Sequence, residues 1–143
     1  MGDIRSEIHA AFGTEAADIK TYSPLTFAYI GDAVFEIIIR TLIVEQGQRA
    51  ANTLHKHTTK IVCAQTQAKM IEAVYGELTE EEQNIYRRGK NTKINSAAKN
   101  ASLADYRKAT GFEALCGYLF LKDDTPRIVA IIKKALELLE IKL

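Results

Sequence analysis

The chain has 143 residues, of which 47% are apolar and 26% are charged, and it contains only two prolines. This length and balance are typical of one compact soluble domain and exclude both a disordered chain and a second large domain. Nineteen Lys and Arg residues against eighteen Asp and Glu residues give a net charge of +1. The protein is therefore not a generally basic nucleic-acid coat, and any partner that it recognises by charge must meet a local patch.

The cysteine pattern and the N-terminal residues bear on the cellular compartment. Cys63 and Cys116 lie far apart and form neither a CxxC motif nor a pair of zinc ligands. The N-terminal residues do not have the pattern of a signal peptide. We therefore expect a cytoplasmic protein in which both cysteines are unpaired and serve as small apolar residues.

The longest apolar stretch covers residues 25–44 and approaches the length of a membrane span. Charged residues recur through it at every fourth position: Asp32, Glu36 and Arg40. This pattern indicates a buried core helix rather than a membrane helix. Ser23 as the N-cap and Pro24 in the first helical position predict where the helix starts, and Gly47 predicts its stop.

Five further helices are predicted after this one. Their approximate ranges are 52–57, 59–75, 79–89 and 102–121, and the last begins at Thr125 and Pro126. Capping boxes mark two of the starts: Thr79 with Glu82, and Ser102 with Asp105. The apolar face of the last helix holds Ile128, Ile131, Ile132, Ala135, Leu136, Leu138 and Leu139. Residues 90–101 lack apolar periodicity and are predicted to form a loop. Because no segment alternates as a half-buried strand does, the predicted fold is all-α.

Several common enzyme motifs are absent from the sequence. It contains no Glu-x-x-His pair, no Walker loop, no G-x-G-x-x-G and no G-x-S-x-G. These absences argue against a di-iron four-helix bundle, against the common loop-type nucleotide hydrolases and against hydrolases with a hydroxyl nucleophile.

Two acidic residues lie in the middle of apolar helices, where an unpaired charge is costly: Asp32 and Glu113. Small residues flank both, so two helix backbones can approach closely and bring the carboxylates together. Converging carboxylates in a low-dielectric site ionise together only around a cation, and their hard oxygens favour Mg²⁺ or Mn²⁺. The alternative is that each acid pairs with a core Arg, a Tyr or a backbone N–H.

The two acids lie in two separated segments, YIGDAVFE at residues 29–36 and FEALCGYL at residues 112–119. The first resembles the signature helix of the ribonuclease III catalytic domain, and the second resembles the second conserved helix of that family. The closer resemblance is to Mini-ribonuclease III, the short bacterial form that lacks a double-stranded RNA-binding domain. It covers about residues 22–140, and the two motifs stand in the right order at the right distance.

The resemblance implies metal-assisted hydrolysis of phosphodiesters in double-stranded RNA, with Mg²⁺ as the cofactor and Mn²⁺ as a substitute. Asp32 and Glu113 are the implied catalytic residues and metal ligands. The ribonuclease III family uses four carboxylates, and the other two positions fall on Ala28 and Thr110. The same losses are characteristic of Mini-ribonuclease III, and they leave the number of metal ions open.

Four more polar residues are weighed for the site. Glu36 and Asp105 are candidates for metal contact, directly or through water, but capping or solvated roles suit them equally well. His55 and His57 are not needed as general bases in this scheme, and we expect them on the surface or facing RNA.

Basic residues cluster between residues 83 and 104, a stretch without a single acid. They are Arg87, Arg88, Lys90, Lys93 and Lys99. Taken alone, such a run is typical of a solvated face. With the family resemblance, we predict that these five residues grip RNA phosphates, and the lack of aromatic residues for stacking among residues 87–99 favours duplex over single-stranded RNA.

The resulting hypothesis is a single all-α ribonuclease III-like catalytic domain over residues 1–143. By resemblance it forms a homodimer with the Asp32 helix near the two-fold axis, and it processes precursor 23S ribosomal RNA, with a ribosomal protein partner left open. The alternative is a non-catalytic RNA- or ribosome-binding helical dimer with the same fold. Retention of both Asp32 and Glu113 argues against that alternative.

Overall fold

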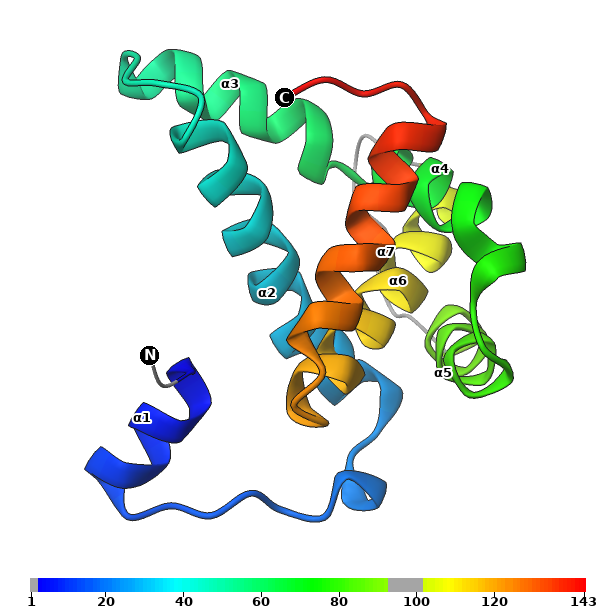
Figure 1. Cartoon of the computed structure of the whole chain (residues 1–143). Helices are drawn as coiled ribbons and strands as arrows, with labels where there is room; N and C mark the ends of the chain where they lie inside the picture. The colour runs from blue at the N-terminus through cyan, green and yellow to red at the C-terminus, as the bar shows by residue number, and fades with distance from the viewer. Residues whose placement is uncertain (1–2, 93–101) are drawn as a thin grey trace.

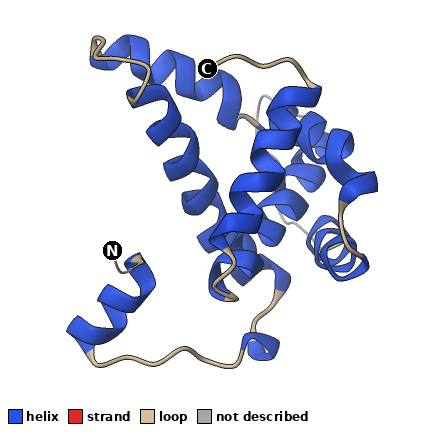
Figure 2. Cartoon of the chain, viewed as in Figure 1, coloured by secondary structure: helices blue, strands red, loops and turns tan. Residues whose placement is uncertain are grey.

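The computed structural model describes residues 3–92 and 102–143, and every regular element within those two ranges is helical (Figures 1 and 2). The α-helices are α1 (Ile4–Phe12), α2 (Pro24–Val44), α3 (Ala51–Val62), α4 (Ala64–Val74), α5 (Glu80–Lys90), α6 (Leu103–Leu121) and α7 (Thr125–Leu138). Two short 3-10 helices, Ile19–Thr21 and Tyr75–Glu77, precede α2 and follow α4. The predicted all-α class is confirmed. Within the described ranges, no helix is long and apolar enough to cross a membrane.

Helix α2 forms as its sequence predicts. The Ser23 hydroxyl accepts a hydrogen bond from the Thr26 N–H, and Pro24 occupies the first turn. The helix ends at Val44, and Gly47 follows with a φ of 132°, a conformation that favours glycine. One face of α2 is buried, which confirms the predicted core helix.

The junction between α3 and α4 was predicted one turn too early. The predicted break lay near Thr58, but this residue is buried and its hydroxyl donates to the Leu54 carbonyl, so the helix continues through it. The break falls at Cys63, whose ψ of 155° is extended. There the Thr66 hydroxyl donates to the Lys60 carbonyl and satisfies an acceptor at the end of α3.

The capping box that starts α5 is confirmed, but the predicted end of this helix is wrong. Thr79 and Glu82 exchange both hydrogen bonds. Gly89, predicted as the stop, lies inside the helix and faces α6, where a Cβ atom would come within 2.7 Å of the Ala114 Cβ. This glycine serves close helix packing, and α5 runs on to Lys90.

The starts of α6 and α7 also agree with the sequence, with two differences in detail. Ser102 accepts from the Asp105 N–H, which is the first half of the predicted capping box. The N-cap of α7 is Asp124, whose carboxylate accepts from the Arg127 N–H, and Pro126 lies in the first turn.

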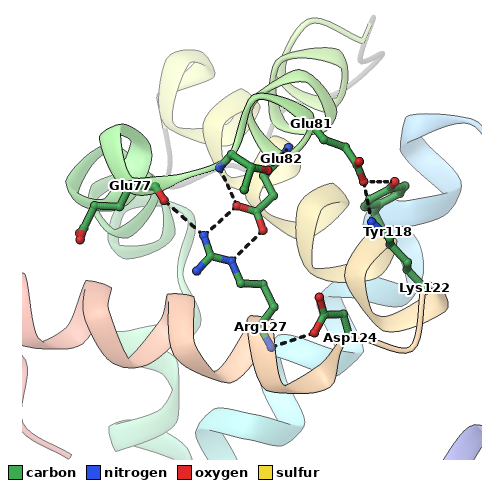
Figure 3. A network of polar contacts seen from close by, with 8 residues as sticks. Glu77, Glu81, Glu82, Tyr118, Lys122, Asp124 and Arg127 are labelled. Atoms are coloured by element: carbon green, nitrogen blue, oxygen red, sulfur yellow. Dashed lines mark hydrogen bonds and ion pairs between the residues drawn. The ribbon is translucent and has the colours of Figure 1, made fainter.

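A partly buried ion pair joins the start of α5 to the start of α7 (Figure 3). The Glu82 carboxylate accepts from Arg127 through Nε at 2.7 Å and Nη2 at 2.8 Å, and also from the Thr79 N–H at 2.8 Å. Arg127 in addition reaches the Glu77 carbonyl at 3.3 Å. The hydrogen bonds from Arg127 hold the pKa of Glu82 below its usual range. Because a buried carboxylate without its partner is costly, this pair fixes α7 against α5.

Helix α6 lies at the centre of the fold and packs against α2, α4, α5 and α7. Its Phe112 ring meets Phe35 of α2 edge-to-face, with the ring centroids 5.4 Å apart. Cys116 of α6 is buried in the same core, and both it and Cys63 are unpaired as predicted. Core packing thus holds α2 and α6, the helices that contain the segments 29–36 and 112–119, against each other.

Helix α1 is the one α-helix that the sequence analysis did not predict. Its ribbon lies to one side of the other helices, and residues 13–23 join it to α2 (Figure 1). Asp3 caps its start and Gly13, with a φ of 65°, ends it. Its buried side chain is Arg5, which pairs with Asp123 and lies over the Phe120 ring.

Candidate active site

Two glycines allow α2 and α6 to cross in direct backbone contact. A Cβ atom at Gly31 would overlap the backbone carbonyl of Glu113, and one at Gly117 would overlap the backbone carbonyl of Phe27. No rotamer change can relieve an overlap with backbone, so both positions require glycine. This is the close approach that the small residues around the two acids predicted.

The crossing brings the two predicted acids together. Asp32 of α2 is exposed and Glu113 of α6 is partly buried, and both line one cavity of about 620 Å³. Burial, a hydrogen bond with Asp32 and the charge of Asp32 together raise the pKa of Glu113 to about 9. Among the described residues, neither acid forms an ion pair with Arg or accepts a hydrogen bond from Tyr. The alternative interpretation, in which each acid pairs with a core Arg or a Tyr, therefore does not hold among the described residues.

The chemistry of this donor pair fits a divalent cation. Two carboxyl groups share one site. The raised pKa of Glu113 indicates that the protein does not provide enough positive charge to stabilise both carboxylates in their ionised form. A hard cation ligated by carboxylate oxygens supplies that compensation. The described residues contain no group of three or more acidic, His or Cys side chains suited to a metal. Asp32 and Glu113 are the cavity acids without a cationic partner among the described residues, and they could hold the ion.

The remaining walls of the cavity include the two positions at which the family pattern has further carboxylates. Ala28 lies one turn before Asp32 on the cavity wall, and Thr110 lies one turn before Glu113. The Thr110 hydroxyl donates to the Tyr106 carbonyl at 3.0 Å, so its proton is already used within α6. Both side chains leave the cavity open beside the two acids.

The two further acids weighed from the sequence differ in their surroundings. Glu36 lines the cavity, but its carboxylate accepts from Arg40 at 3.1 and 2.8 Å in an ion pair along α2. Asp105 is not among the cavity-lining residues and lies at the N-terminus of α6, where its N–H is capped by Ser102. His55 and His57, both on α3, do not line the cavity.

Three of the five predicted RNA-binding cations lie on α5, and none of these three lines the cavity. Arg87 and Arg88 are exposed and Lys90 is partly buried. Arg87 donates to the Tyr75 hydroxyl at 3.2 Å, and it lines a separate hollow of about 390 Å³ together with Lys90. Two further predicted cations, Lys93 and Lys99, fall outside the described residues.

One polar residue at the site was missed by the sequence analysis. Gln67 of α4 is buried, and its side chain lies close enough to the Glu113 carboxyl to lower the pKa of that group. In the sequence, this residue could have been found as the one polar side chain among the apolar residues that form the buried face of α4. The other buried residues of that face are Ala68, Met70, Ile71 and Val74.

Comparison with known proteins identifies the family. The Ribonuclease III domain model matches residues 25–124, which include both acids and the cavity. The chain belongs to the ribonuclease III family. Among its relatives is the Mini-ribonuclease 3 of Clostridium tetani, 47% identical over 86% of this chain and 82% of the relative. That of Enterococcus faecalis is 46% identical over 80% of this chain and 89% of the relative.

The fold of a solved structure agrees with this assignment. A crystal structure of a protein from Fusobacterium nucleatum superposes with a TM-score of 0.75 at 30% identity, covering 81% of this chain and 89% of that one. As a member of the ribonuclease III family, of the Mini-ribonuclease III type, the protein is an endoribonuclease. Ribonuclease III enzymes depend on divalent metal, act on double-stranded RNA and are typically dimeric.

The raised pKa of Glu113 predicts a pH-dependent stability. An acid with a higher pKa in the folded state binds its proton more tightly there, so this stabilisation is present below the ordinary value of 4.5 and is lost as the pH rises toward 9. In metal-free buffer at pH 8.5, the free energy of unfolding of Glu113→Gln should therefore exceed that of wild type by about 1–3 kcal/mol. Denaturant titration measures this difference. At pH 5 the two proteins should differ little. Equal stabilities at both pH values would show that Glu113 is not desolvated.

Proposed function

We propose that this endoribonuclease cleaves structured double-stranded RNA at the Asp32–Glu113 cavity, as a homodimer, and that its substrate is precursor 23S ribosomal RNA. The observation that carries the proposal is the convergence of these two carboxyl groups at the α2–α6 crossing, in a cavity open beside them. The ribosomal substrate rests on the resemblance to Mini-ribonuclease III. The whole chain, residues 1–143, then acts as one catalytic domain.

The chain's own residues have distinct tasks in this reaction. Asp32 and Glu113 hold the divalent ion, whose chemistry when bound is to polarise the phosphate and to activate a water molecule. Both carboxylates would have to be ionised to hold that ion, and the proton of Glu113 would be released to solvent. The small side chains of Ala28 and Thr110 leave room for a phosphate group next to the acids.

An apolar stripe on α2 supports the homodimer. Leu25, Tyr29, Ala33 and Ile37 repeat at every fourth position and are all exposed, Tyr29 by 83% and Ile37 by 61%. Such a stripe on one helix face is typical of an interaction surface. A second copy packed on it by a two-fold axis would bring two cavities together, one for each strand of a duplex.

The test is cleavage of duplex RNA with and without Mg²⁺, with mapping of both product ends. We expect Mg²⁺-dependent cuts on both strands that leave 5′-phosphate and 3′-hydroxyl ends, from a protein that sediments as a dimer. Precursor 23S RNA should be cut faster than an unrelated duplex of equal length. Duplex binding without any cut would favour the non-catalytic RNA-binding alternative, and a monomer that nicks one strand would contradict the dimer.

The basic segment makes a separate prediction about salt. Each phosphate neutralised by a cation steepens the dependence of RNA affinity on salt by a log–log slope of roughly 0.9. Replacing Arg88, Lys90 and Lys93 by Ala should therefore flatten this slope by several units in the dimer. Turnover at saturating RNA should change much less, because these cations are not ligands of the ion. Lys133→Ala is the control, since this exposed cation of α7 faces Glu137. An unchanged slope in the triple variant would place the RNA elsewhere.

A further inference from the structure

Gln67 is a buried amide next to the cavity acids. It lies in the middle of α4 and is 3% exposed, and α4 packs directly against α6. Its neighbours on the buried face of the helix are apolar. Its amide nitrogen, Nε2, has no hydrogen-bond partner of standard geometry among the described residues.

A buried amide donor without a full hydrogen bond weakens the fold. The desolvation of its amide nitrogen is not compensated by a hydrogen bond, and an apolar side chain of similar size would avoid that loss. The group beside this amide is the Glu113 carboxyl, across the packed contact between α4 and α6. An N–H donor at this place can give its unused hydrogen bond to a carboxylate oxygen and so fix the direction in which the carboxylate points.

We propose that Gln67 is a positioning residue, whose amide orients the Glu113 carboxylate toward the cavity so that it can bind the divalent ion together with Asp32. The inference rests on the proposed function, because it assumes that Glu113 is a metal ligand. A carboxylate on a helix surface can take several rotamers, and a donor from a second helix restricts them. Residues that orient a metal ligand in this way commonly contribute about 10- to 100-fold to metal affinity or activity.

The test removes the amide and keeps the volume. Gln67→Met retains an unbranched side chain, and Gln67→Leu is a second apolar variant in case the first packs poorly. Three quantities are measured: Mn²⁺ affinity from the EPR signal of the free ion, turnover at saturating RNA, and RNA affinity without divalent metal. Met70→Leu, a buried change three positions along α4, controls for disturbed packing.

We expect both Gln67 variants to bind Mn²⁺ about 10-fold or more weakly and to turn over correspondingly more slowly. Their RNA affinity without metal should stay within about twofold of wild type, and their thermal stability should be equal or higher because a buried unpaired donor is gone. A purely structural residue would instead lower stability and leave the Mn²⁺ affinity of the folded protein unchanged. Wild-type Mn²⁺ affinity in both folded variants would overturn the inference.

A double variant separates this inference from the proposed function. If Gln67 acts through Glu113, then Gln67→Met combined with Glu113→Gln should bind Mn²⁺ no more weakly than Glu113→Gln alone. Additive losses would overturn the positioning role and leave Glu113 as a ligand. Wild-type Mn²⁺ affinity in Glu113→Gln would overturn the proposed metal site and the inference with it.

Discussion

Replacing Asp32 by Asn or Glu113 by Gln should lower the single-turnover rate of duplex RNA cleavage by on the order of 1,000-fold or more, while RNA binding survives. Each change removes one of two carboxylates at the α2–α6 crossing, and a site left with one anionic ligand holds a divalent ion poorly. Binding survives because phosphates contact cations, not carboxylates. In metal-free buffer, where the ion makes no contribution to RNA affinity, removing a negative charge near the RNA should if anything tighten the complex. Rapid-quench cleavage and gel-shift titration on the same duplex measure the two effects.

Glu36→Gln is the matched control for these variants. It lies on the same helix one turn after Asp32 and lines the same cavity, but its carboxylate is paired with Arg40. We expect cleavage within a few-fold of wild type. A loss as large as that of Asp32→Asn would make Glu36 a third participant in the site, and a wild-type rate in either principal variant would remove that residue from it.

Gly31→Ala should damage both the fold and the site. The added Cβ atom would overlap the Glu113 backbone carbonyl, so α2 must move away from α6. Overpacking against backbone is more costly than overpacking against a flexible side chain, and we expect a loss of about 3 kcal/mol in the free energy of unfolding. A displacement of about 1 Å between reacting groups can cost 100-fold in rate, so cleavage should fall by at least that factor. Urea unfolding and the cleavage assay measure the two losses.

Gly76→Ala provides the control for this change. A Cβ atom at Gly76 meets nothing within 4 Å, and its backbone does not have the positive φ that favours glycine. We expect stability within about 1 kcal/mol of wild type and unchanged cleavage. If Gly31→Ala behaved in the same way, the tight crossing of α2 and α6 would not be needed to build the cavity.

The helices that were predicted well are those whose starts carry a local chemical signal. Ser23 with Pro24 and Thr79 with Glu82 satisfy backbone groups of their own turn, so a few adjacent residues determine where the helix begins. Ends were harder to predict, because a glycine can serve either as a stop or as a packing contact. Gly89 is the second kind, and only the position of Ala114 on another helix reveals this.

The candidate site was predictable for a different reason. A carboxylate in an apolar helix is unfavourable unless it has a function or a partner, so Asp32 and Glu113 stand out in the sequence by themselves. Gln67 did not stand out, because a neutral amide is common on helices and its meaning depends on a neighbour 46 positions away in the chain. The placement of the predicted cations relative to the cavity likewise depends on tertiary packing.

Of the acids that line the cavity, Asp32 and Glu113 are not paired with a cation within the described ranges, and this has a consequence for how the proposed site would respond to metal and RNA. A hard divalent ion accepts about six oxygen ligands, and two carboxylates leave several of these to water and to the phosphates of the RNA. An ion held by these two residues would therefore strengthen RNA binding, and RNA would strengthen ion binding by the same factor. At a fixed concentration of free Mg²⁺, the concentration of RNA would then determine what fraction of the protein carries the ion. The proposed site would be complete only when RNA and ion are both bound.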